Sequence, residues 1–266
     1  MLPMIRIRAL AALLSVAALA ACEKNAVQVI TSPISGAFVR FQNYGVNAPG
    51  VNFYANDQKV TAVNSASCTP PVDPRCTTTG IEATTGVTYG SVASGGNYAM
   101  LVPGQYTLSS RIAATVDKGL AVSSVNTTLA DGKYYSYFVS GIYNTTAKAT
   151  DAFIVEDDLP TSFDYTKAYI RFVNASANAP TISATTKLQG TTDVVSVATN
   201  LAYKAASPFV TVVPGLTDIT ITLAGAPPVT AVGVPLIGGH VLTLTLRGDA
   251  TSATATGLSI SGSFNR

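Results

Sequence analysis

The sequence has no tryptophan, a single histidine and few charged residues, which make up only 11% of the chain. This fraction is well below the roughly 25% that is typical of soluble proteins. A lone histidine without a Gly-x-Ser-x-Gly elbow argues against triad chemistry, which needs a base held beside a nucleophile. No Gly-rich phosphate loop, metal-spaced cluster or dinucleotide fingerprint occurs. The sequence therefore reveals no reaction, and we expect a protein that is not an enzyme and carries no cofactor.

An excess of basic charge is also missing. The chain has 16 basic and 14 acidic side chains, and loss of residues 1–21 would remove two arginines and no acid. The remaining chain is then nearly neutral, without the basic footprint that nucleic-acid binding requires. Threonine, serine, alanine, valine and glycine dominate instead, which favours an exported β-sheet protein.

The N-terminal segment has the pattern of an export signal. Arg6 and Arg8 precede an apolar stretch from Ala9 to Ala21, which is too short to span a bilayer comfortably. Its ending, Leu19-Ala-Ala-Cys22, resembles the lipobox of bacterial lipoproteins. The alternative is an ordinary secretory signal in which the cysteine follows two alanines by chance.

The lipobox resemblance implies cleavage before Cys22 and a diacylglycerol on its thiol, with a further fatty acyl chain on the new amine. Two or three acyl chains would anchor the protein durably without a transmembrane helix. Glu23 stands where an aspartate signals inner-membrane retention in such lipoproteins. We therefore expect a signal peptide at 1–21, a lipidated tether at 22–35, and a location at the outer membrane, facing the periplasm or the cell surface.

Two further cysteines, Cys68 and Cys76, flank a segment with three prolines, which argues for a loop. In an oxidising compartment a disulfide is the default, and it would contribute about 2–3 kcal/mol by restricting the unfolded chain. A redox pair would call for Cys-x-x-Cys spacing, and a metal site would need more ligands than two sulfurs. The sequence predicts a structural disulfide between these cysteines.

The chain contains an internal repeat. Residues 37–49 recur at 168–180 with Arg-Phe-x-Asn and Asn-Ala-Pro in common, and two later blocks recur in the same order. These blocks are Val102-Pro-Gly104 with Val213-Pro-Gly215, and Leu129-Ala-Asp-Gly132 with Leu236-Ile-Gly-Gly239. The repeat predicts two homologous domains at 36–159 and 166–266, joined by a linker at 160–165.

Alternating residues within the repeats predict strands. Ala37, Val39 and Phe41 share one face in the first copy, and Leu242, Leu244 and Leu246 share one in the second. Gly- and Pro-rich turns separate these strands, and no helical period occurs outside the signal peptide. We therefore expect an all-β protein of two tandem antiparallel Ig-like β-sandwiches, each with a buried core under an exposed face. An eight-stranded barrel is the structural alternative.

The repeated pattern resembles domain of unknown function family 4397 (DUF4397), a bacterial extracytoplasmic family. The pattern comprises the Arg-Phe-x-Asn strand, the Pro-Gly turn, a Gly-x-Tyr-Tyr strand and an acidic tail, which the first copy has at Glu156-Asp-Asp158. The second copy matches well only at 170–176 and ends without the acidic tail. The resemblance covers nearly all of 36–266, and it implies a β-sandwich module at the cell envelope with no established activity.

Three groups of side chains are candidate sites. Glu156, Asp157 and Asp158 could bind calcium or, as we favour, form a solvated junction between the domains. Arg40 and Arg171, at equivalent positions, could bind an acidic ligand or, as we favour, make a structural contact to a neighbouring carbonyl or carboxylate. The tyrosines at 134, 135, 137 and 143 could stack on a sugar, although strand tyrosines more often pack within the sheet.

These features predict a lipid-anchored envelope protein with a structural, adhesive or ligand-binding role. Its partners would be the membrane, through the anchor, and a surface glycan or an envelope protein. One alternative is a carbohydrate-binding or carbohydrate-active protein, which would show a cleft with convergent carboxylates. Another is a periplasmic scaffold of an envelope complex, which would show an apolar patch or an open sheet edge.

Overall fold

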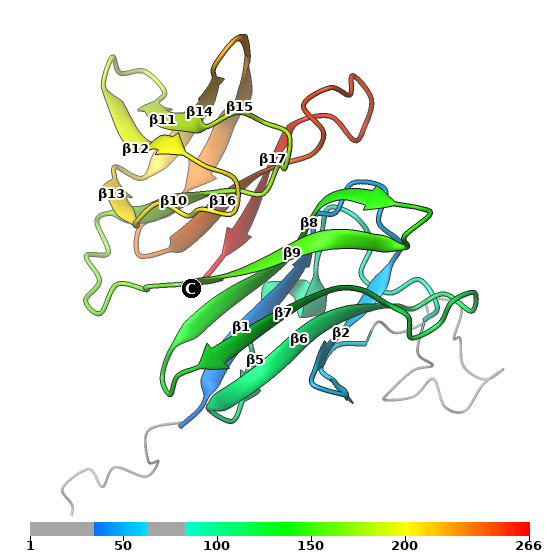
Figure 1. Cartoon of the computed structure of the whole chain (residues 1–266). Coiled ribbons are helices and arrows are strands. Elements are labelled where there is room, and N and C mark those ends of the chain that lie inside the picture. Colours follow the sequence, from blue (N-terminus) through cyan, green and yellow to red (C-terminus); the bar gives the residue numbers. More distant parts are fainter. Residues whose placement is uncertain (1–34, 63–82) are drawn as a thin grey trace, which may run out of the picture. The chain divides into compact units, whose positions relative to one another are not determined.

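The computed structural model describes residues 35–62 and 83–266 (Figure 1). The predicted signal peptide, Cys22 and the predicted Cys68–Cys76 disulfide lie outside these residues. The described residues from Gly36 onward form one compact unit. Their regular elements are all strands except for one short 3-10 turn, η3 (Ala93–Gly96), so the predicted all-β sandwich class is confirmed. Within the described residues, no helix is long and apolar enough to cross a membrane.

The first half contains two sheets. The first, here called inner sheet 1, consists of β1 (Ala37–Asn43), β4 (Ser91–Val92), β5 (Ala99–Leu101), β8 (Tyr134–Asn144) and β9 (Ala149–Glu156). The second, outer sheet 1, consists of β2 (Val51–Ala55), β3 (Gln58–Lys59), β6 (Gly104–Ile112) and β7 (Ala121–Leu129).

The second half repeats this arrangement. Inner sheet 2 consists of β10 (Ala168–Asn174), β13 (Val210–Val212), β16 (Val241–Arg247) and β17 (Ser259–Phe264). Outer sheet 2 consists of β11 (Ile182–Leu188), β12 (Val194–Leu201), β14 (Gly215–Leu223) and β15 (Ala226–Leu236). The strands β10, β16 and β17 correspond to β1, β8 and β9, and β13 corresponds to β5, which pairs with β1 in the same register. In the outer sheets, the order β12-β11-β14-β15 corresponds to β3-β2-β6-β7.

One strand pair in each half is parallel. The first strand of each half pairs in parallel with the next-to-last strand of that half, β1 with β8 and β10 with β16, while the other pairs among the described strands are antiparallel. A side-chain alternation shows which residues share a face but not the direction of the neighbouring strand. The sequence could therefore predict the faces of β1 and β10 but not their parallel pairing.

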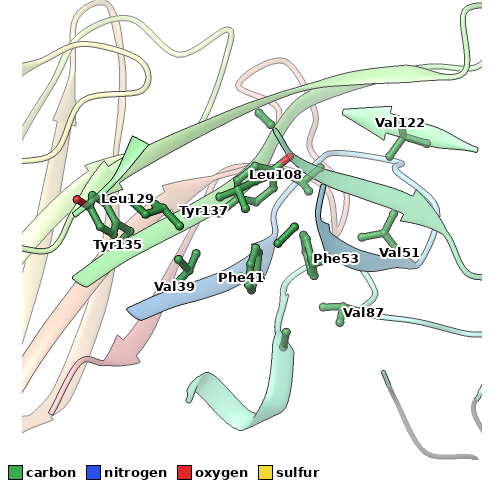
Figure 2. Packing of buried hydrophobic residues seen from close by; sticks show 14 of the residues in the cluster. Val39, Phe41, Val51, Phe53, Val87, Leu108, Val122, Leu129, Tyr135 and Tyr137 are labelled. Atoms are coloured by element: carbon green, nitrogen blue, oxygen red, sulfur yellow. The ribbon is translucent and has the colours of Figure 1, made fainter. Parts of the chain in front are cut away.

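Each half has its own hydrophobic core between its inner and outer sheets. In the first half, Val39 and Phe41 of β1 meet Phe53 of β2, Leu108 of β6 and Tyr137 of β8 (Figure 2). The Phe41 and Phe53 rings stack with centroids 5.0 Å apart. In the second half the equivalent faces of the strands meet in the same way around Ile170, Phe172 and Leu244. The predicted core faces of the repeated strands are therefore confirmed.

The opposite faces of the inner sheets are buried as well, so the expectation of an exposed face was wrong for these strands. Arg40 and Gln42 of β1 and Thr243 and Thr245 of β16 are fully buried. Here the two inner sheets contact one another through an apolar cluster that draws on both halves. It consists of Tyr44, Phe138, Phe153, Val173 and Ala175, with Val155 and Ala206 packed against it. These polar side chains of β1 and β16 are typical of an exposed face, but here that face is buried because it packs against the other half.

Candidate functional site

Arg171 lies in the middle of β10 and reaches from the second half to the first. Its Nη1 donates to the carbonyl oxygen of Glu156 at 3.0 Å, and its Nη2 donates to the carboxylate of Asp157. Its Nε donates to Thr243 Oγ1 at 3.0 Å on the neighbouring strand β16. The guanidinium also lies 4.7 Å from the Phe209 ring centroid, in a cation–π arrangement. All three of its nitrogens thus have partners.

Asp157 follows the end of β9 and is buried, with no exposed side-chain surface. Besides Arg171, its carboxylate accepts hydrogen bonds from Tyr98 Oη at 2.6 Å and from Ser136 Oγ at 2.7 Å. Arg40 Nη2 lies 4.0 Å away. A buried carboxylate is stable only when it is paired and hydrogen-bonded, and these contacts provide both.

Arg40 lies on β1 and reaches in the opposite direction, from the first half to the second. Its Nη1 donates to the carbonyl oxygen of Phe264 at 2.7 Å, and its Nη2 donates to Ser136 Oγ at 3.2 Å. Its guanidinium lies 5.0 Å from the Tyr98 ring centroid. Among the described residues, its Nε has no hydrogen-bond partner.

The two arginine contacts are equivalent. Tyr135 pairs with Glu156 across β8 and β9, and Leu242 pairs with Phe264 across β16 and β17. Because Tyr135 and Leu242 correspond in the repeat, Glu156 corresponds to Phe264. Each arginine therefore donates to the equivalent backbone carbonyl of the other half. This reciprocal pattern is that of an isologous interface.

The equivalence fails at one position, where Asp157 of the first half corresponds to Asn265 of the second. Asn265 Oδ1 accepts a hydrogen bond from Thr243 Oγ1 at 2.7 Å, and its Nδ2 donates to Tyr98 Oη at 2.7 Å. Asn265 is buried like Asp157. Two guanidinium groups thus share one carboxylate in this network, with an amide in place of the second.

Tyr98 connects the two non-equivalent residues, and the sequence analysis missed it. Burial, and secondarily the negative charge of Asp157, raises the pKa of Tyr98 well above its ordinary value, so it stays a neutral hydrogen-bond donor. Tyr98 precedes β5 and follows the Gly95-Gly96 turn. No sequence signal distinguished it from the other tyrosines, because it belongs to no repeated block.

This group of residues, the arginine–aspartate network, consists of Arg40, Arg171, Asp157, Tyr98, Ser136, Thr243 and Asn265. Its guanidinium groups are buried and directed at protein atoms, with Arg40 0% and Arg171 2% exposed. The network therefore joins the two halves rather than presenting donors to an acidic ligand.

The three neighbouring acids are not brought together. Glu156 and Asp158 are exposed and Asp157 is buried, so the solvated-junction interpretation is wrong for Asp157. Glu156 Oε1 accepts from Lys133 Nζ at 2.7 Å on the surface. Within the described ranges, no group of three histidine, cysteine or acidic side chains is placed to hold a metal ion.

The tyrosines of β8 pack within the first half. Tyr135 and Tyr137 belong to its buried core, and Tyr143 packs against that core. Tyr134 stacks on Phe38 with ring centroids 4.6 Å apart. Their rings therefore pack against protein and do not form the open aromatic face on which a sugar would stack.

The chain was compared with models of known protein families, and one model matches a range that begins at the first strand. A family model described as "Domain of unknown function (DUF4397)" matches residues 37–185. The chain belongs to this family. The DUF4397 match begins at β1 and continues through Asp157 and Arg171 into β11, so it includes residues of the network from both halves.

No curated protein matches the chain. Among solved structures, a leucine-rich repeat protein from Bacteroides thetaiotaomicron matches over 79% of this chain, with 12% identity and a TM-score of 0.19. The chain spans 25% of the length of that protein. A likeness at this level carries no argument about fold or function.

Proposed function

We propose that this DUF4397 protein is a lipid-anchored component of the cell envelope whose two halves form one rigid, non-enzymatic structural or display element. The lipobox ending at Cys22 supports the anchor, and the absence of aspartate after it supports the outer membrane. The second half would be a divergent tandem copy of the family domain. The strand order that recurs in both halves supports this part of the proposal.

The reciprocal arginine contacts carry the proposal of a rigid element. Arg40 and Arg171 each cross to a carbonyl of the other half, and Asp157 lies buried between them. Buried charged hydrogen bonds are directional, and separating the halves would leave these charges unpaired. The two sandwiches should therefore keep one orientation, as a spacer or display element requires.

The anchor is tested with a Cys22→Ser variant in cells that are fed a labelled fatty acid. The wild-type protein should take up the label and partition into the detergent phase, and Cys22→Ser should do neither. A Cys76→Ser variant is the matched control, since it also removes a thiol but should retain the label. Unchanged detergent partitioning of Cys22→Ser would contradict the lipid anchor.

Rigidity is tested by pulsed electron paramagnetic resonance with one spin label on each outer sheet. Thr128 of β7 and Thr230 of β15 are exposed and serve as labelling positions after substitution by cysteine, with the three native cysteines replaced by serine. We expect one narrow distance distribution. A broad distribution would show that the halves move independently and would contradict the proposed rigid element.

The side of the membrane is tested by protease treatment of intact and lysed cells. Cleavage on intact cells would favour display at the surface and would direct the search to glycans and host proteins. Protection until lysis would favour a periplasmic structural role and a search for an envelope partner by crosslinking in cells.

The Cys68–Cys76 disulfide remains a prediction. Peptide mass maps of the native protein under non-reducing and reducing conditions should differ by one linked peptide that contains both cysteines. Free thiols at these two positions in the native protein would contradict it.

A further inference from the structure

The compact unit has one end at which the chain enters from the tether. Gly36 donates its backbone N–H to Asp131 Oδ1 at 2.7 Å, and its carbonyl accepts from Gly132 at 2.8 Å. Ala37 pairs with Leu101, so the turn that follows β5 lies beside this entry point. Met100 and Val102, on either side of Leu101, are exposed there.

The second half presents its equivalent end on the same side. The carbonyl of Lys167 accepts from the Gly239 N–H at 2.7 Å, which repeats the Gly36–Gly132 contact, and Ala168 pairs with Val212. A hollow of about 470 Å³ is lined by Gly132 and Lys133 of the first half together with Asn265 and Arg266. The entry turn of the first half and the last residues of the second therefore share one surface.

Large apolar side chains gather at this end, here called the tether end. Both repeated Val-Pro-Gly turns expose their valine, and other apolar side chains flank the turn at Gly238-Gly239. The exposed apolar side chains of the tether end are Met100, Val102, Tyr165, Val213, Ile237 and Phe264. Among the described residues, the opposite end of the first half exposes Val116, Leu120 and Ile142. A gathering of this kind marks a contact surface more often than chance exposure does.

We propose that the tether end rests on the lipid bilayer, with Met100 and Val102 in contact with its apolar interior. The inference rests on the proposed lipid anchor at Cys22. Thirteen residues, 23–35, separate that anchor from Gly36. Fully extended, they span at most about 45 Å, so the unit is held close to the membrane by the end that carries these side chains. A tethered surface meets the bilayer at a high effective concentration, so a weak contact is enough.

The charges at the tether end indicate an apolar contact. Lys133 and Arg266 lie near Glu156 and Asp158, and Lys133 already pairs with Glu156 at 2.7 Å. This mixture has no basic excess that would attract anionic lipids. Tyr165 has an apolar ring and a polar hydroxyl, a combination that suits a membrane interface. The contact should therefore form on zwitterionic vesicles and persist in high salt.

The absence of tryptophan allows a site-specific test. Val102→Trp puts a single tryptophan at the tether end, and Val116→Trp puts one at the opposite end. The two valines are matched in exposure, at 74% and 75%. Each variant is attached to phosphatidylcholine vesicles with or without bromine in the acyl chains. Attachment uses the native lipid in one series and, in another, a histidine tag in place of residue 22 on nickel-chelating lipids.

We expect the emission of Val102→Trp to shift to shorter wavelength and to be quenched by the brominated lipid, in low and high salt alike. The emission of Val116→Trp should stay unchanged. Equal behaviour of the two variants on vesicles would overturn the membrane contact. A blue shift of Val102→Trp without vesicles that grows with protein concentration would overturn it in favour of a second copy of this chain.

Failure of the anchor and failure of the contact are distinguishable. If the natively processed protein does not float with vesicles, the lipid anchor is wrong, while the tagged series still tests the contact. If the protein floats and Val102→Trp is not quenched, the anchor stands and the contact is refuted. Val213→Trp, measured in the same way, tests whether the second half also contacts the bilayer.

Discussion

Replacing Asp157 by asparagine should destabilise the protein strongly. The substitution keeps the shape of the side chain but removes the one carboxylate that, among the described residues, pairs with both Arg40 and Arg171. It also places an amide nitrogen among donors, since Arg171, Tyr98 and Ser136 all donate to this carboxylate. Removing one partner of a buried ion pair costs about 3–5 kcal/mol. In a unit of this size that loss lowers the Tm by roughly 10 °C.

The assay is urea unfolding followed by circular dichroism, because the chain has no tryptophan. Asp158→Asn is the matched control, since it makes the same chemical change at the next, exposed residue. Surface substitutions of that kind change the free energy of unfolding by about 0.5 kcal/mol or less. If Asp157→Asn costs no more than Asp158→Asn, the buried network does not stabilise the protein and the reasoning is refuted.

A second substitution tests the geometry of the network. Asn265 is the structural equivalent of Asp157 and follows Phe264, whose carbonyl accepts from Arg40. Asn265→Asp in the Asp157→Asn background should therefore recover part of the lost stability by supplying a new counter-charge. No recovery, with the fold retained, would show that the two positions are not interchangeable.

The remaining predictions concern the same interface. Arg171→Lys should lower the free energy of unfolding more than Arg40→Lys, because all nitrogens of Arg171 have partners while Arg40 Nε has none among the described residues; equal losses would contradict this. Burial raises the pKa of Tyr98 above its ordinary 10.0, so as the pH rises the unfolded chain loses the phenol proton before the folded protein does. The free energy of unfolding should therefore be constant below about pH 10 and fall above it, and it should fall less steeply in Tyr98→Phe. Urea midpoints measured across that pH range would test this. A fragment of residues 166–266 should melt cooperatively, and adding residues 36–159 in trans should raise its Tm; no change on mixing would argue against the interface.

The sequence predicted the elements that obey a simple alternation. Val39 and Phe41 lie in the first core because every second residue of β1 faces the outer sheet, and the repeat gave the same answer for β10. The opposite face of β1 was not predictable. Arg40 and Gln42 have the polarity of a solvent face, and only packing against the second half buries them.

The network was only partly visible in the sequence for the same reason. The recurrence of Arg40 and Arg171 singled out two of its members, and the acidic tail singled out a segment without showing which acid is buried. Tyr98 and Asn265 gave no signal, since each becomes important only through contacts with residues distant in the chain. Sequence patterns report local periodicity, whereas these contacts depend on how two complete sheets meet.

The reciprocal pairing of the inner sheets has a consequence for assembly. When a surface pairs with its own equivalent, a single contact buries both surfaces. Neither surface is then available to bind a further copy. Because both equivalents belong to one polypeptide here, this pairing happens within each molecule as it folds. The inner faces are thereby removed from any growing filament, and higher assemblies of the chain would have to use the outer sheets, their edges or the two ends of the unit.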